Sequence, residues 1–176
     1  MKTPANIQVL ALDVDGVMTD GTIAFAQILH TESKSFHVHD GLGISLWQLA
    51  GNHTILISGR NADCVKHRAQ ELGIAHVHQG SKNKIADLRT SLAKIGATPE
   101  QTCFVGDDLG DLPIMQQVGY SIAVGNAVQE VKAYAQHTTT ARGGHGAVRE
   151  AIEHLMKAAG TWDNAVDSCM NEPVKQ

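Results

Sequence analysis

The stretch of sequence that decides the fold is IQVLALDVDG, residues 7–16. It opens with a β-branched, apolar run and stops at Asp13. Near-continuous apolarity over this length is typical of a parallel strand that is buried on both faces. Four further segments have the same character and are predicted as strands: 53–57, 75–78, 102–105 and 121–124.

Helical patterns alternate with these strands. Apolar residues recur at helical spacing, in two cases with a glycine at the end, in four segments: 62–72, 84–95, 128–135 and 147–159. Thr98 and Pro99 are typical of a further helix start. The alternation predicts an α/β fold, in which a doubly wound, Rossmann-like parallel sheet is covered by helices on both faces.

Two segments depart from the alternation. Residues 19–39 contain strand-like pieces at 22–26 and 35–38, and we expect a β-hairpin that projects from the first strand. Residues 161–176 are polar and weakly patterned, and we expect an extended or mobile tail there. A chain of 176 residues has room for one domain, which we place at 1–160.

Composition excludes several classes of function. The formal net charge of −4 argues against nonspecific binding to nucleic acid or to anionic membranes. No apolar stretch approaches the ~20 residues of a membrane span, and residues 1–8 lack the apolar core of a signal peptide. The cysteines form no CxxC pair, so we expect a reducing, cytoplasmic location.

Residues that can carry chemistry follow the predicted strands. Asp13 and Asp15 come after the first strand, Ser58 after the second, and Asp107 after the fourth. Lys84 stands at the start of the helix after the short third strand. Ligands of open α/β sheets bind beyond the carboxyl ends of the strands, so we expect these side chains to meet there.

Such a group of side chains predicts phosphoryl-transfer chemistry. Clustered carboxylates need a counterion, and Mg²⁺ prefers oxygen ligands of this kind. Asp13 can attack phosphorus to form an aspartyl phosphate, while Asp15 can protonate the leaving oxygen and then activate water. Lys84 and the Ser58 hydroxyl can hold the phosphate oxygens. A lone DxD is weak evidence, but the order and common placement of all these segments favour a functional site.

The motifs also resemble those of a known family. DVDGVMTDG at 13–21, followed in order by Ser58-Gly59, Lys84 and GDDLGD at 106–111, is similar to the four motifs of the haloacid dehalogenase superfamily. FHVHDGLGI at 36–44, together with Arg60, resembles the capless branch that contains 3-deoxy-D-manno-octulosonate 8-phosphate phosphatases. The resemblance implies a Mg²⁺-dependent phosphoric monoester hydrolase that acts on this sugar phosphate in lipopolysaccharide precursor synthesis.

The resemblance also implies roles for individual residues. Catalysis is expected from Asp13, Asp15, Ser58 and Lys84. Mg²⁺ is expected on the carboxylates of Asp13 and Asp107 and on the backbone carbonyl of Asp15. The expected substrate contacts are His37, His39, Asp40, Gly41, Gly59, Arg60 and Arg68.

A capless site needs another wall, and the gaps between the motifs are too short to hold a cap domain. In the capless branch a neighbouring subunit completes the site and the assembly is a tetramer, so we expect a homotetramer. The predicted hairpin offers apolar residues for that contact: Ile23, Phe25, Ile28 and Leu29.

Two alternatives stay open at this stage. Sister phosphatases of nine-carbon nonulosonate 9-phosphates share most motifs but tend to carry glutamate where this chain has Arg60, so Arg60 favours the eight-carbon acid. His39 and His145 stand where many octulosonate enzymes have a permanent cation, which makes their roles open. A non-catalytic oligomerisation domain of the same fold is the other alternative, although the intact Asp13 and Lys84 argue against it.

Overall fold

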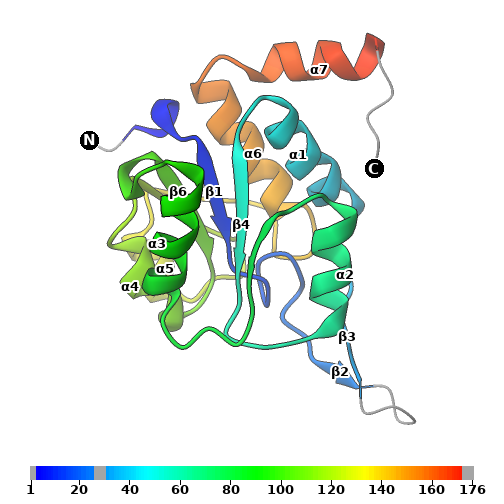
Figure 1. Cartoon of the computed structure of the whole chain (residues 1–176), viewed down its shortest axis with the longest axis vertical. Helices are drawn as coiled ribbons and strands as arrows, with labels where there is room; N and C mark the ends of the chain where they lie inside the picture. Colours follow the sequence, from blue (N-terminus) through cyan, green and yellow to red (C-terminus); the bar gives the residue numbers. More distant parts are fainter. Residues whose placement is uncertain (1–2, 26–30, 172–176) are drawn as a thin grey trace.

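The computed structural model describes residues 3–25 and 31–171, and a six-stranded parallel sheet forms its centre (Figure 1). The strands lie in the order β5-β4-β1-β6-β7-β8. Their bounds are β1 Val9–Leu12, β4 His53–Ile57, β5 His76–His78, β6 Thr102–Gly106, β7 Tyr120–Ala123 and β8 His137–Thr138. All four residues of β1 are fully buried between β4 and β6, as their continuous apolarity predicts. The predicted α/β fold with a doubly wound parallel sheet is confirmed.

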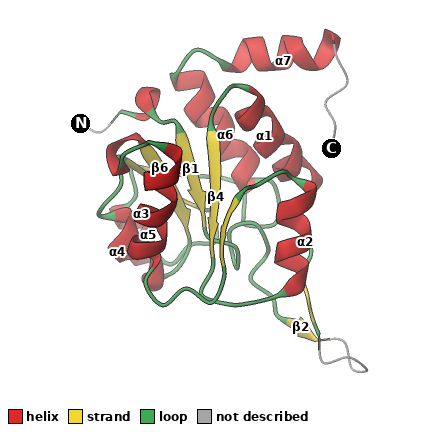
Figure 2. Ribbon diagram, viewed as in Figure 1, coloured by secondary structure: helices red, strands yellow, loops and turns green. Residues whose placement is uncertain are grey.

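Helices cover both faces of this sheet (Figure 2). On one face lie α1 Val38–Leu49, α2 Asp63–Glu71 and α6 Ala147–Ala158. On the other face lie α3 Lys84–Ile95, α4 Leu112–Met115 and α5 Gln129–Tyr134. Short 3₁₀ turns occupy residues 4–6, 99–101 and 109–111. Since β1 has parallel neighbours on both sides, the loops after β1, β4 and β6 emerge together at one end of the sheet.

The hairpin leaves this same end of the sheet. Its strands are β2 Ala24–Phe25 and β3 Glu32–Ser33, which pair antiparallel with Ala24 opposite Ser33. Ile28 and Leu29, predicted as contact residues, lie outside the described residues. The hairpin projects away from the helical layers (Figure 2), and its apolar side chains Ile23 and Phe25 are exposed.

One predicted strand is wrong, and one predicted helix start leads only to a short turn. Residues 35–38 do not form a strand, because His37 caps α1: its ring Nδ1 accepts a hydrogen bond from the backbone N–H of His39 at 3.3 Å. Thr98 is an N-cap followed by Pro99, as predicted, but the helix that it starts is a single 3₁₀ turn, because the chain enters β6 directly at Thr102.

The predicted extended tail is also wrong over its described part. Helix α7, Trp162–Asn171, follows α6 and lies across its end (Figure 1). The ring of Trp162 packs against two cations of α6, with centroid distances of 4.9 Å to Arg149 and 5.6 Å to Lys157. Such a tertiary contact cannot be read from the polar pattern. Among the described residues, no helix combines the length and apolarity that crossing a membrane requires.

Candidate active site

The sheet brings the predicted catalytic side chains to one place. Asp13 directly follows β1, Ser58 follows β4, and Asp107 follows β6. Lys84 is the first residue of α3, whose N-cap is Asn83, so its ammonium reaches the same edge. The Nζ atom of Lys84 lies 2.5 Å from Oδ1 of Asp13, although 71 positions separate the two residues.

Lys84 is the cationic centre of this group. Its Nζ also lies 2.7 Å from Oδ1 of Asp111, in the turn after β6. Burial lowers the pKa of Lys84, but the charges of Asp13 and Asp111 outweigh burial and raise it, so the ammonium stays charged. A fixed cation beside a buried carboxylate suits the binding of a phosphate group.

Three carboxylates crowd around this lysine. Oxygen atoms of Asp13, Asp107 and Asp111 all lie within 4.8 Å of one another. The pKa of Asp13 is raised to about 7, first by desolvation and then by the charge of Asp111. The pKa of Asp107 is likewise raised to about 7, by desolvation and then by the charge of Asp13. One lysine does not neutralise this group, so its donor set fits a divalent cation with oxygen ligands.

Hydrogen bonds between side chains and backbone groups fix the loop that carries Asp13 and Asp15. The Thr19 hydroxyl donates to the carbonyl of Val14 and accepts from the N–H of Gly16, both at 3.3 Å. From the loop after β7, the side chain of Asn126 donates to the carbonyl of Gly16 at 2.9 Å. Its Oδ1 accepts from the N–H of Gly143 at 2.5 Å, which joins a third loop to the same site. Sequence reasoning missed Asn126, since no motif marks it.

The carboxylate of Asp15 faces Ser58. The hydroxyl of Ser58 donates to Oδ2 of Asp15 at 3.3 Å and accepts from the backbone N–H of Arg60 at 3.0 Å. The ammonium of Lys34 donates to the other oxygen, Oδ1, of Asp15. Lys34 was not among the predicted site residues, because a single lysine in a hairpin has no distinguishing pattern.

Lys34 and Arg60 share one carboxylate on the hairpin. Lys34 donates to Oε1 of Glu32, and Arg60 donates to both oxygens of Glu32 at 2.8 and 3.3 Å. These hydrogen bonds lower the pKa of Glu32 to about 2, and the bond from Arg60 has the larger effect. Arg60, a predicted substrate contact, is therefore paired within the chain, while 42% of its side chain stays exposed.

The other predicted substrate contacts lie around α1 and α2. His37 and His39 pack ring against ring at the start of α1, with centroids 4.8 Å apart. Asp40 is 2% exposed, and its Oδ1 accepts from the backbone N–H of Arg149 in the first turn of α6. Burial raises the pKa of Asp40. The hydrogen bond from Arg149 to Asp40 therefore connects α6 to α1.

Arg68 and the two predicted glycines complete that set. Arg68 forms an ion pair with Glu71 at 2.8 Å and lies over the ring of Phe36. A Cβ atom on Gly41 would lie 2.3 Å from Nη2 of Arg68, so glycine at this position gives the guanidinium its room. Gly59 lies between Ser58 and Arg60 at the end of β4. The resemblance implied these residues as substrate contacts, and in the structure Arg68 donates to Glu71 on its own helix.

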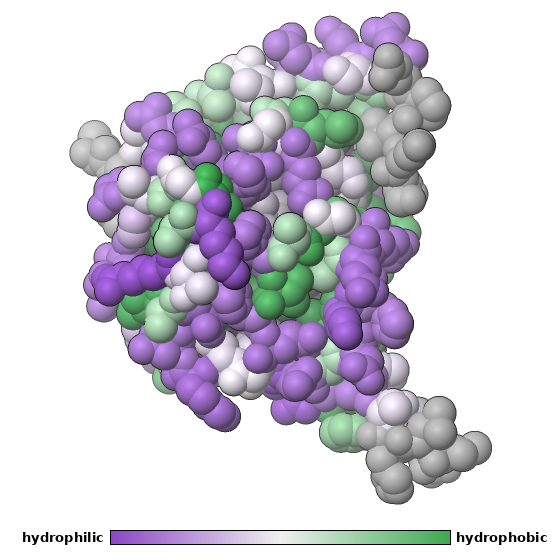
Figure 3. Space-filling model, viewed as in Figure 1, coloured by the Kyte–Doolittle hydropathy of each residue, from purple (hydrophilic) through white to green (hydrophobic). Residues whose placement is uncertain are grey.

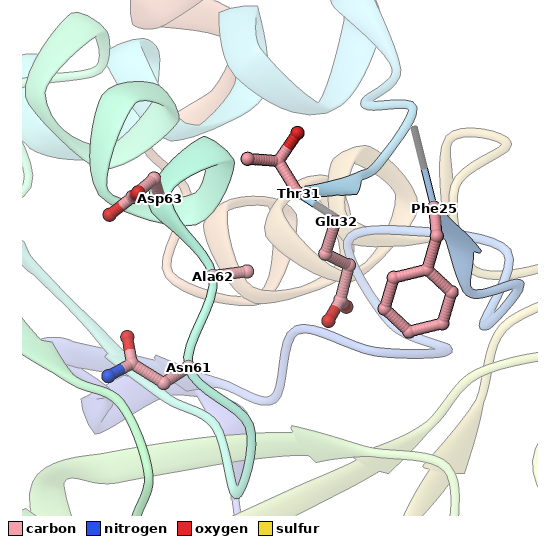
Figure 4. Close-up of a pocket in the computed structure, with 6 residues that line it drawn as sticks. All are labelled: Phe25, Thr31, Glu32, Asn61, Ala62 and Asp63. Atoms are coloured by element: carbon pink, nitrogen blue, oxygen red, sulfur yellow. The ribbon is translucent and has the colours of Figure 1, made fainter. Parts of the chain in front are cut away.

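A cavity of about 460 Å³ opens between the hairpin and the start of α2 (Figure 4). Phe25, Thr31 and Glu32 of the hairpin line one side of it, and Asn61, Ala62 and Asp63 line the other. Because Glu32 also contacts Lys34 and Arg60, this cavity borders the site at Asp15. It is open to solvent.

Comparison with known proteins identifies the family. A family model described as haloacid dehalogenase-like hydrolase matches residues 57–152. The chain is 41% identical to 3-deoxy-D-manno-octulosonate 8-phosphate phosphatase of Escherichia coli K12, over 91% of this chain and 85% of that protein. This chain belongs to the haloacid dehalogenase-like hydrolases. The resemblance predicted from the motifs is confirmed.

Solved structures of such hydrolases agree with the fold. The 3-deoxy-D-manno-octulosonate 8-phosphate phosphatase of Moraxella catarrhalis, solved in complex with magnesium, phosphate and KDO, matches with a TM-score of 0.90. It is 36% identical, and the match covers 94% of this chain and 95% of that one. The phosphatase of Yersinia pestis matches with a TM-score of 0.88 at 39% identity, over 91% of this chain and 86% of that one. A Haemophilus influenzae relative was solved in a cobalt-bound form, with a TM-score of 0.85 at 36% identity over 89% of this chain and 91% of that one.

Proposed function

We propose that this protein is a Mg²⁺-dependent phosphatase that hydrolyses 3-deoxy-D-manno-octulosonate 8-phosphate to the free sugar acid and inorganic phosphate. The observation that carries the proposal is the contact of Lys84 with Asp13 at 2.5 Å inside a group of three carboxylates. Relatives that match nearly the whole chain carry this activity in their names. A place in lipopolysaccharide precursor synthesis follows from the proposed substrate. A cytoplasmic location is also part of the proposal, and three free cysteines fit its reducing conditions.

The first step is attack by Asp13 on the phosphorus atom. One carboxylate oxygen of Asp13 forms a bond to phosphorus while the bond from phosphorus to the sugar oxygen breaks. The sugar oxygen leaves with the electron pair of that bond and takes a proton from the carboxylic acid of Asp15. Lys84 stabilises the negative charge on the phosphate oxygens during this transfer.

The second step returns the enzyme to its starting state. The carboxylate of Asp15 takes a proton from water, whose oxygen attacks the phosphorus of the aspartyl phosphate. The bond from phosphorus to Asp13 breaks, which releases inorganic phosphate and leaves Asp13 as a carboxylate. Asp13, Asp107 and the backbone carbonyl of Asp15 would hold Mg²⁺, which would supply positive charge against the repulsion between the carboxylates and the phosphate.

The sugar end of the substrate would extend toward the hairpin and α2. Arg60 lies at the border of the cavity and is the residue that we propose for the carboxylate of the sugar acid. Arg68, His37, His39 and Gly41 are proposed as further contacts along α1 and α2. An arginine at position 60, where the nine-carbon enzymes tend to have glutamate, supports the eight-carbon substrate.

The open cavity supports an assembly in which a second copy completes the site. Ile23 is 43% exposed and Phe25 is 65% exposed on a hairpin that its own fold leaves uncovered. Figure 3 shows hydrophilic residues mixed with hydrophobic areas on the visible face, and a small hydrophobic area lies beside the hairpin. We propose that the hairpin packs on a neighbouring subunit of a homotetramer.

A panel of sugar phosphates tests the proposed function. Release of inorganic phosphate is measured with the eight-carbon acid 8-phosphate, a nine-carbon nonulosonate 9-phosphate and glucose 6-phosphate. The proposal expects the highest kcat/KM for the eight-carbon acid, and none for Asp13→Asn. A preference for the nine-carbon substrate contradicts the substrate assignment, and full activity in Asp13→Asn contradicts the mechanism.

A further inference from the structure

The most deeply placed cation of the hairpin points into the active site. Lys34 follows β3 by one residue, and only 1% of its side chain is exposed. Its ammonium donates to Asp15 and to Glu32. A buried ammonium is costly unless it is paired, so these two carboxylates determine where Lys34 lies.

A chain of charges holds this lysine in place. Glu32, whose side chain is 9% exposed, is held on its other side by Arg60 from the end of β4. Pairing of Ala24 with Ser33 fixes the strand just before Lys34. Burial lowers the pKa of Lys34, but the hydrogen bonds to Asp15 and Glu32 outweigh it and raise that pKa. The lysine is therefore a fixed, charged group.

Asp15 is the group that this arrangement orients. Lys34 donates to Oδ1 of Asp15, and the hydroxyl of Ser58 donates to Oδ2. Donors on opposite oxygens restrict rotation of the carboxyl group about its last bond. The proton that passes between Asp15 and the leaving oxygen needs this group within hydrogen-bond reach of that oxygen.

We propose that Lys34 is a positioning residue, which holds the carboxyl group of Asp15 in the orientation for proton transfer to the leaving oxygen. The inference rests on the proposed function, in which Asp15 carries that proton. It makes the closing strand of the hairpin part of the active site of its own chain, in addition to any contact with a neighbour. Among the described residues, the hydrogen bonds of Lys34 go to Asp15 and Glu32, and not to the nucleophile Asp13.

Leaving-group chemistry separates this role from a structural one. p-Nitrophenolate leaves readily without a proton, whereas phenolate is a poorer leaving group and depends more on the acid. Neither aryl phosphate carries the carboxylate of the sugar acid, so contacts to that carboxylate do not affect the comparison. General acid–base catalysis contributes about 10²–10⁴-fold, so a displaced Asp15 gives a measurable difference between the two esters.

The variants are Lys34→Met, which removes the ammonium, and Lys34→Arg, which keeps a cationic donor. For Lys34→Met we expect kcat/KM to fall by about 10-fold or more on phenyl phosphate and by less than about 3-fold on p-nitrophenyl phosphate. Lys34→Arg should restore much of the phenyl phosphate activity. Lys66→Met, on an exposed part of α2, is the matched control and should change neither rate.

Equal falls on both esters overturn the inference and assign Lys34 a structural role alone. Circular dichroism and thermal unfolding check that each variant folds. If Lys34→Met does not fold, Glu32→Gln replaces it, because loss of that charge loosens Lys34, and the same order of falls is expected. A wild-type protein without phosphatase activity would instead overturn the proposed function, which keeps the two failures distinct.

Discussion

The backbone of Gly16 lies directly against the carboxylate of Asp107: a Cβ atom on residue 16 would lie 2.0 Å from Oδ2 of Asp107. Gly16 also has a φ of +92°, a conformation that costs an L-residue roughly 1–2 kcal/mol. Both constraints require glycine. The loop that carries the nucleophile and the proposed metal ligand after β6 are therefore packed together without an intervening side chain.

This contact predicts that Gly16→Ala weakens metal activation more than stability. The new methyl group must displace the Asp107 carboxylate, and displaced groups around a metal typically cost about 10-fold or more in affinity. We expect the Mg²⁺ concentration for half-maximal activity to rise accordingly. Gly110→Ala is the control, because a Cβ atom there meets nothing within 4 Å. Unchanged Mg²⁺ activation in a folded Gly16→Ala variant would contradict the packing argument.

Removal of the metal ligand gives the second prediction. Asp107→Ala leaves too few anionic ligands to hold Mg²⁺, so we expect activity to fall by at least about 100-fold. EDTA should abolish wild-type activity in the same way, and added Mg²⁺ should restore it. The measurement is phosphate release before and after chelation. Full turnover by the wild type in metal-free buffer would remove Mg²⁺ from the mechanism.

The cluster of Asp13, Asp107 and Asp111 predicts how the stability of the protein depends on pH when no metal is bound. Asp13 and Asp107 have folded-state pKa values of about 7, above the roughly 3.9 of an unfolded aspartate. The folded state therefore binds more protons between these values, so the free energy of unfolding falls as the pH rises from about 4 to about 7. Thermal unfolding in EDTA at several pH values measures this loss.

Mg²⁺ and Asp13→Asn should each reduce that loss. Mg²⁺ binds the deprotonated carboxylates, so its stabilisation should grow as the pH rises through the same window. Asp13→Asn removes one of the repelling charges, so its melting temperature in EDTA should depend less on pH than that of the wild type. If the variant and the wild type lose stability in parallel between about pH 4 and pH 7, the cluster of aspartates does not cause the loss.

Much of the fold and of the phosphate site could be predicted from the sequence, because both depend on local patterns. The continuous apolarity of 7–12 predicts a central strand, and the strand ends bring Asp13, Ser58 and Asp107 to one edge. The position of Lys84 could be predicted because it is the first residue of a regular helix. In these places local propensity, burial and topology agree.

The parts that sequence reasoning missed depend on contacts between distant segments. Lys34 and Glu32 acquire their role only when the hairpin folds back onto Asp15 and Arg60. Likewise, α7 forms where Trp162 can pack on α6. Neither contact leaves a periodic signal in its own segment, so pattern reading assigned an ordinary hairpin and an extended tail.

The last prediction concerns the hairpin as an interface between copies. Replacing Ile23 and Phe25 together by aspartate would place two unpaired charges in the proposed contact, where burial of an unpaired charge is strongly destabilising. Both side chains are exposed in the single chain, so the fold itself should survive. We expect the variant to sediment as a smaller species in analytical ultracentrifugation.

The variant should also lose more activity on the eight-carbon sugar phosphate than on p-nitrophenyl phosphate, because Asp13, Lys84 and Asp107 all come from one subunit. Thr22→Asp, an exposed change on the same hairpin that lies outside the lining of the cavity, tests whether any added charge has this effect. A folded double variant that stays the same size as the wild type would show that the hairpin is not the interface. Equal loss of both activities would show that it does not complete the sugar site.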